Sequence, residues 1–248
     1  MKTLFYSLIL IAIYACTTDT TSKNPSVESE ILNTFTNTRI KNFEESLIKA
    51  LSLTSTKNDF EEVLKTDLIK KENLLTKDFS RKLSKISSAY NPENDTILNI
   101  KILELKDRII SFEPNESDND DIIKEKFLSY MNNEKEVFIQ TINSQDDLTD
   151  IQKDILINQA TYELGIITVL SEHSEELHKL GNVQYNVNNQ LKVSNDCNWW
   201  CRNRKAILCS GMSLGAAGCW VSVVYGCVPC VDICAGLTVL SVLCWTNG

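Results

Sequence analysis

The chain has 248 residues, of which 43% are hydrophobic, and a formal net charge of −8. This length allows one or two small domains, and an acidic chain without a basic stripe is not expected to bind nucleic acid. Eight of the nine cysteines and all four tryptophans lie at Cys197 or later. This segment has three basic residues and one acidic residue, Asp232. The change in composition predicts a domain boundary, with a linker at 181–196.

Residues 1–15 predict a secretory signal peptide. Lys2 precedes an apolar run that is shorter than the roughly 20 residues of a membrane span. The stretch Ile13–Cys16 resembles a bacterial lipobox, which implies cleavage before Cys16 and a lipid on its sulfur. Residues 16–25 then form a polar tether, and the protein is expected at the cell envelope, on the outer membrane or the cell surface. The alternative is an ordinary signal peptide in which Cys16 is incidental.

The acidic region 26–180 predicts helices, because its apolar residues recur at helical spacing and Gly165 is its single glycine. Thr149 and Gln152 form a capping box at the start of the best-defined helix, which we expect to end near Gly181. We therefore predict an all-α fold, an antiparallel bundle or a loose array. The expected helices cover 31–51, 60–68, 79–90, 97–112, a segment that starts with a cap and acidic residues at 117–121, and 149–181.

The sequence of the region 26–180 gives little support for a catalytic site. His173 and His178 are five residues apart, so they do not share a helix face as two zinc ligands at i and i+4 do. A solvated helix end is the simpler interpretation. The region also lacks a glycine-rich phosphate loop, and no nucleophile–base pair can be chosen. We expect a protein that is not an enzyme and has neither a cofactor nor a metal site.

The tail, 197–248, carries a dense cysteine framework. In an exported protein, eight cysteines in so short a segment predict four disulfides, and they allow 105 connectivities. A redox role for the Cys227–Cys230 pair and a zinc site are weaker alternatives, because the tail lacks a βαβ context and a matching second ligand pair. The cysteines are Cys197, Cys201, Cys209, Cys219, Cys227, Cys230, Cys234 and Cys244.

The tail is also strongly apolar, since residues 206–231 carry no charge. We expect two short helices, about 202–225 and 230–243, pinned together by disulfides as a small module. The small residues of the tail have two interpretations. They allow the two helices to pack closely under the disulfides, or they form a helix face that enters a membrane. A third possibility is a single membrane span with reduced thiols. The predicted membrane-contact residues are Trp199, Trp200, Arg202, Arg204, Lys205, Gly211 and Gly215.

The start of the tail, Cys197-Asn-Trp-Trp-Cys201 followed by seven residues and Cys209, is similar to the start of halocin-like peptides. Eight cysteines in about fifty residues also resemble the fulvocin C-related pattern. The resemblance covers the tail and the overall plan of export signal, acidic helical segment and apolar tail. It implies a secreted antimicrobial peptide whose upstream segment is a leader or an immunity partner.

Together these patterns predict an exported lipoprotein with a bacteriocin-like, membrane-active tail. The acidic region would keep the tail soluble or silent until a protease cuts the linker, and the partners would be the anchoring membrane, a target-cell membrane and an immunity factor. The alternative is a cell-surface lipoprotein without enzymatic activity, whose disulfide-stapled module binds a protein partner.

Overall fold

The computed structural model describes residues 26–88, 95–115, 117–185 and 198–211, with 238, 239, 242, 243, 245 and 246. Within these ranges the chain is mainly helical and has no strand, which confirms the all-α prediction. The predicted signal peptide 1–15, the predicted tether 16–25 and most of the predicted linker lie outside the described residues. The helices are α2 (Val27–Leu53), α3 (Lys57–Ser88), α4 (Asp95–Ile110), α5 (Asp120–Asn143), α6 (Asp150–Glu172), α7 (Ser174–Tyr185) and α8 (Trp199–Gly211).

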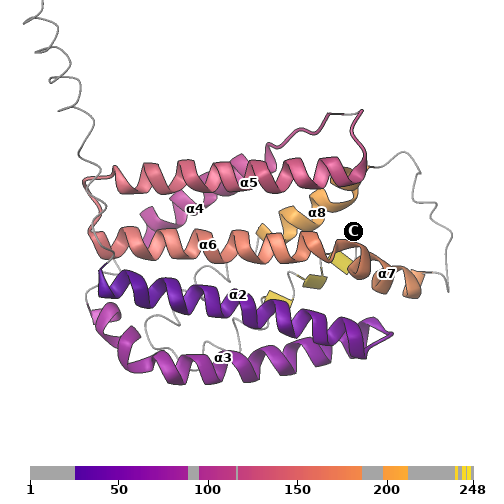
Figure 1. Cartoon of the computed structure of the whole chain (residues 1–248), viewed down its shortest axis with the longest axis horizontal. Helices are drawn as coiled ribbons and strands as arrows, with labels where there is room; N and C mark the ends of the chain where they lie inside the picture. The colour runs from indigo at the N-terminus through magenta and orange to yellow at the C-terminus, as the bar shows by residue number, and fades with distance from the viewer. Residues whose placement is uncertain are drawn as a thin grey trace, which may run out of the picture.

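The four longest helices lie side by side in the order α3, α2, α6 and α5 (Figure 1). Helices α4 and α8 pack together against α5 and α6, and α7 extends from the end of α6. A single cluster of buried apolar side chains runs through all of these helices and includes Val239, Val242 and Trp245 from the tail. In this structure, therefore, the described part of the tail shares one core with the helical region instead of standing apart from it.

Helix α2 illustrates how local sequence starts an element and packing completes it. The side chain of Ser26 accepts a hydrogen bond from the backbone N–H of Ser29 at 3.1 Å, and acidic residues occupy the first turn, where they favour the helix dipole. Leu32, Phe35 and Phe43 follow at helical spacing and are fully buried. Most of the helix's stability comes from this buried face.

Helix α3 corrects one prediction, because the helices expected at 60–68 and 79–90 are a single helix. The polar residues Glu72 and Thr76 lie between the two expected helices. Both residues are buried, 2% and 3% exposed. No Gly or Pro interrupts the helix between residues 69 and 78. The buried carboxylate of Glu72 pairs with a residue of α2.

That partner is Arg39, whose Nε lies 2.7 Å from Oε2 of Glu72, with both side chains 3% exposed. The guanidinium also lies 4.4 Å from the ring centroid of Tyr162 on α6. Burial raises the pKa of Glu72 despite the opposing effect of Arg39. The side chain of Thr238 in the tail hydrogen-bonds Tyr162. A buried ionic cluster thus joins α2, α3, α6 and the end of the tail.

The sixth predicted helix begins as expected but ends earlier. The capping box is confirmed: the N–H of Thr149 donates to Oε1 of Gln152 at 2.8 Å, and the N–H of Gln152 donates back to the Thr149 hydroxyl. The chain turns at His173, where the hydroxyl of Ser174 donates to the carbonyl of Ser171 at 2.9 Å. The predicted terminator Gly181 consequently lies inside α7, which continues to Tyr185.

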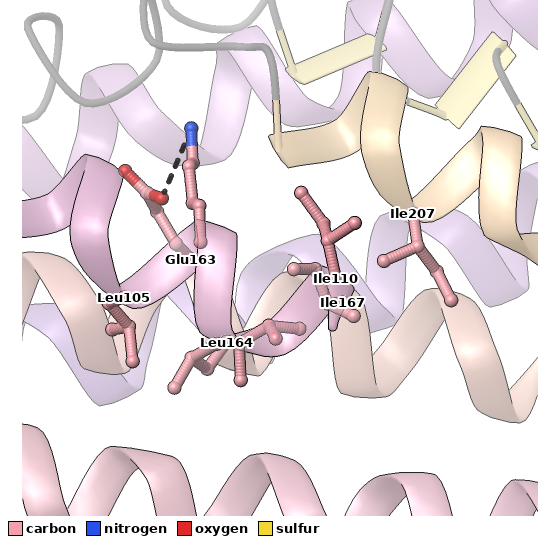
Figure 2. A pocket seen from close by; sticks show the side chains of 8 residues that line it. Leu105, Ile110, Glu163, Leu164, Ile167 and Ile207 are labelled. Carbon is pink, nitrogen blue, oxygen red and sulfur yellow. Dashed lines mark ion pairs between the residues drawn. The ribbon is translucent and has the colours of Figure 1, made fainter. Parts of the chain in front are cut away.

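A pocket lies between α4, α6 and α8 (Figure 2). Its volume is about 330 Å³ including the open mouth. The ion pair of Lys106 and Glu163, 3.7 Å apart, lies toward one end of the view and Ile207 of α8 toward the other. The remaining lining residues are Leu105, Ile109, Ile110, Leu164 and Ile167.

Candidate functional site

The start of the tail folds onto the helical body as α8, and the surface that receives it is the candidate functional site. The side chain of Asn198 caps α8 by accepting a hydrogen bond from the N–H of Cys201 at 3.0 Å. Because of this cap, α8 begins at Trp199, three residues before the predicted start at 202. We call the body residues that contact α8 here the docking site: Phe112, Asp120, Phe127, Ser174 and His178.

The aromatic half of the docking site encloses both tryptophans. Trp200 packs between Phe112 and Phe127, and its ring centroid lies 5.1 Å from that of Phe112 and 5.2 Å from that of Phe127. The ring centroid of Trp199 lies 5.6 Å from that of Phe127. The two indoles are only 4% and 6% exposed. The polar edge of Trp199 is satisfied as well, since its Nε1 donates to the hydroxyl of Ser174 at 3.2 Å. Large apolar surfaces and an indole N–H are therefore both accommodated.

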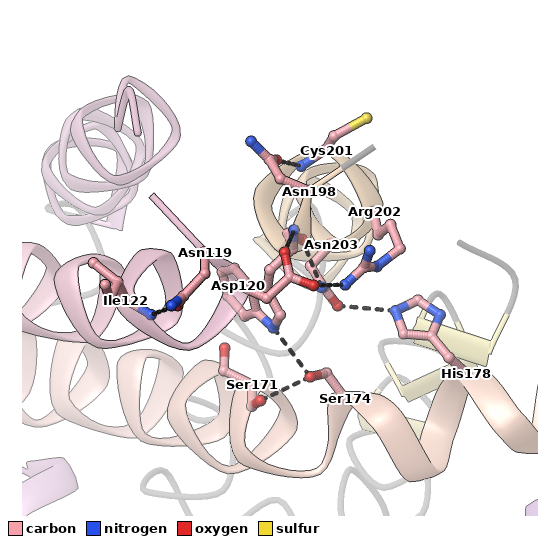
Figure 3. A network of polar contacts seen from close by, with 11 residues as sticks. Asn119, Asp120, Ile122, Ser171, Ser174, His178, Asn198, Cys201, Arg202 and Asn203 are labelled. Atoms are coloured by element: carbon pink, nitrogen blue, oxygen red, sulfur yellow. Dashed lines mark hydrogen bonds and ion pairs between the residues drawn. The ribbon is translucent and has the colours of Figure 1, made fainter. Parts of the chain in front are cut away.

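Asp120 forms the charged half of the docking site (Figure 3). Its Oδ1 accepts the backbone N–H of Trp199 at 2.6 Å, and its Oδ2 pairs with the guanidinium of Arg202. Asp120 is in the first turn of α5, which is capped by Asn119. The carboxylate therefore lies near the N-terminal ends of two helices and one guanidinium, all of which attract its negative charge.

A second polar contact joins α7 to α8. The Nδ2 of Asn203 donates to the carbonyl of Trp199 at 2.7 Å, which leaves its Oδ1 to accept a hydrogen bond from Nε2 of His178 at 3.0 Å. The neutral His178 ring must carry its proton on Nε2, and the protonated ring can make the same bond. His178 thus belongs to the docking site and is not at a helix end, whereas His173 is the C-cap of α6.

The structure places the predicted membrane-contact residues in different surroundings. Trp199 and Trp200 are buried and Arg202 pairs with Asp120, whereas Arg204 is exposed and Gly211 ends α8. A membrane role for the tryptophans stays a prediction, and it requires α8 to leave the docking site. The side chain of Lys205 and Gly215 lie outside the described part of the chain.

Of the predicted disulfide cysteines, Cys201 has a described side chain. It is exposed on α8 and disulfide-bonded. The predicted lipidation site Cys16 and the side chains of the other predicted disulfide cysteines lie outside the described residues: Cys197, Cys209, Cys219, Cys227, Cys230, Cys234 and Cys244. Among the described residues, no cluster of three His, Cys, Asp or Glu side chains could hold a metal ion.

Substituting Asp120 with alanine should lower the free energy of unfolding by about 0.5–1 kcal/mol, because it removes the acceptor for the Trp199 N–H and a half-exposed ion pair. Urea unfolding at low and high salt would measure the effect, part of which 1 M salt should screen. Asp121→Ala is the matched control, since Asp121 is exposed in the same turn of α5. Equal losses in both variants would contradict a specific role for Asp120.

Within the described ranges, no helix combines the length and hydropathy needed to cross a membrane. Comparison of the chain with protein-family models, curated proteins and solved structures finds no match. Likeness to a known protein therefore assigns no function to the docking site.

Proposed function

We propose that this protein is an exported, lipid-anchored precursor whose tail is a bacteriocin-like, membrane-active peptide. In this proposal, the helical body 26–185 covers the membrane-binding residues of the tail until the linker is cut within 186–196. Cys16 carries the anchor, and the tail contacts a target membrane after release.

The burial of Trp199 and Trp200 is the observation that carries the proposal. Tryptophan side chains are favoured at membrane interfaces, where the ring is half in lipid and the indole N–H remains hydrated. Here the rings contact Phe112 and Phe127, and one indole N–H binds Ser174. The same surfaces cannot contact a bilayer at the same time, so docking and membrane binding exclude each other.

The charges support the same interpretation. The body is acidic, while the tail has Arg202, Arg204 and Lys205 against Asp232. Docking pairs Arg202 with Asp120, which withdraws one positive charge from any membrane contact. Each basic side chain near an anionic bilayer contributes about 1 kcal/mol of attraction. Leaving the docking site would therefore restore both the apolar and the electrostatic parts of membrane affinity.

A second function is supported by the other end of the tail. Val242 and Trp245 are fully buried in the same core, and Thr238 hydrogen-bonds Tyr162. A tail held at both ends would suit a permanent part of the protein. In that case the chain is a non-enzymatic envelope lipoprotein that binds a protein partner.

Intact masses of the protein from the cell envelope and from the culture medium, with and without reduction and alkylation, separate the two functions. The precursor proposal expects a diacylglycerol adduct on Cys16 in the envelope form and a peptide of about fifty to seventy residues in the medium. Full-length protein alone, with nothing released, would favour the permanent envelope role.

A vesicle assay tests the covering role of the body directly. The oxidised full-length chain, carrying a specific protease site within 186–196, is added to dye-filled vesicles that contain anionic phospholipid. We expect little dye release before cleavage and strong release after it. The control is the same protein with inactivated protease. Cleaved protein that releases no more dye than uncleaved protein would overturn the membrane-active role.

A further inference from the structure

We propose that Cys201 is a site of thiol–disulfide exchange, where a small anionic thiol attacks the disulfides of the tail while α8 remains docked on the body. The inference concerns a reactive site of the folded chain and does not depend on the proposed function. It is drawn from the position of Cys201 on α8, from its disulfide bond and from the charge beside it.

Helix α8 has two faces with different surroundings. The residues on the face toward the body are at most 6% exposed: Trp199, Trp200, Asn203, Ala206 and Ile207. Since successive helical residues are rotated by about 100°, Cys201 falls on the opposite face, and it is exposed. Figure 3 shows its sulfur pointing away from Asp120, Ser174 and His178 of the docking site. Docking on the body therefore does not cover Cys201.

The disulfide bond makes the sulfur of Cys201 an electrophile for thiolates. When an external thiolate attacks Sγ of Cys201, a new S–S bond forms between the two sulfurs and the old S–S bond breaks. The partner cysteine leaves as a thiolate and takes up a proton from water. The external thiol is oxidised to the disulfide level while the partner sulfur is reduced, so the exchange consumes no other oxidant or reductant. Access to the attacked sulfur is one of the factors that set its rate.

A positive charge lies beside Cys201 on the exposed face of α8. Arg204 is three residues further along the helix, a spacing that makes the two side chains neighbours on the helix surface, and it is exposed. Arg202, in contrast, pairs with Asp120 of the docking site. An exposed cation raises the rate at which an anion encounters the site, and salt screens this attraction. Thiols that carry a carboxylate are therefore favoured at Cys201 over neutral thiols.

The exchange is tested on the oxidised, native full-length protein with thioglycolate as the probe. Samples are quenched with acid at early times, the freed thiols are alkylated, and the mixed disulfide is located by peptide mass. We expect an adduct on Cys201 at a rate within about tenfold of that in urea-unfolded protein, because the attack needs no prior opening of the fold. Indole fluorescence should keep its native value while the adduct forms, since Trp199 and Trp200 stay buried.

Two results would overturn the site. One is an adduct on Cys201 that forms only in proportion to the unfolded fraction of the protein, which would show that the folded chain covers the sulfur. The other is a loss of the native indole fluorescence before the adduct appears, which would show that α8 has to leave the docking site first.

Arg204→Gln tests the preference for an anionic thiol. At low salt it should slow the exchange of Cys201 with thioglycolate about two- to threefold, and it should leave the exchange with neutral 2-mercaptoethanol unchanged. About 1 M salt should remove the difference between wild type and variant. The matched control is Lys70→Gln, the same loss of one charge at an exposed position of α3, which should alter neither rate. Equal thioglycolate rates for wild type and Arg204→Gln at low salt would contradict the role of Arg204.

Discussion

Replacing Arg39 with methionine is expected to lower the free energy of unfolding by about 3–5 kcal/mol, because it leaves the buried carboxylate of Glu72 without its counter-charge. Arg39 and Glu72 are each only 3% exposed at the side chain. Methionine keeps much of the length and apolar contact of the arginine stem, so the loss reports mainly the missing charge. Urea unfolding followed by circular dichroism measures it.

The loss should depend on pH in a defined direction. The pKa of Glu72 is already raised by burial, and without the favourable charge of Arg39 it should rise further. A carboxyl with a raised pKa in the folded state is tolerated when protonated and destabilises the fold as the pH rises through that pKa. The difference between wild type and Arg39→Met should therefore be smallest in acid and largest at neutral pH and above.

The double variant Arg39→Met, Glu72→Met provides the control. Replacing both members of a buried ion pair with apolar residues of similar size is often nearly neutral. We expect the double variant to regain most of the stability that the single variant loses. A double variant as unstable as Arg39→Met would show that the arginine acts through packing, for example against the ring of Tyr162.

Trp200→Ala is expected to lower the free energy of unfolding by about 3–5 kcal/mol and to release α8 from the docking site. The indole is 6% exposed and contacts Phe112 and Phe127, so its removal leaves a cavity between α8, α5 and the segment after α4. Limited proteolysis of the native protein should then cut near α8 at lower protease concentration than in wild type. Urea unfolding gives the free energy.

Val137→Ala is the control for this change, because Val137 is on α5 and 45% exposed. It should alter the free energy of unfolding by no more than about 0.5 kcal/mol. Cuts spread over the whole chain of Trp200→Ala, with none made first near α8, would mean that α8 unfolds only together with the whole body. That result would count against a tail that can leave the docking site.

Much of the fold was predictable because its signals are local. The cap of α5 at Asn119 and the capping box at Thr149 depend on residues within one turn, and both are present. The burial of Glu72 in α3 was not predictable, because its partner Arg39 is 33 residues away in the chain. A buried charge and an exposed charge look alike in a hydrophobic pattern.

The docking site could not be predicted from the sequence for the same reason. Trp199 meets Asp120 across 79 residues of chain, and His178 meets Asn203 across 25. The tryptophans were recognised as important, but their amphipathic character fits a membrane interface and an aromatic protein core equally well. Only the packing shows which of these environments they occupy in the folded chain.

The attachment of α8 to the body through a single covalent connection has a consequence for the concentration dependence of docking. While the linker is intact, the tail docks within one molecule, so the docked fraction does not change when the protein is diluted. After a cut in the linker, the same contacts hold two separate chains, and their association follows mass action. One hydrolysed peptide bond would thus make docking sensitive to dilution without altering any contact between α8 and the body.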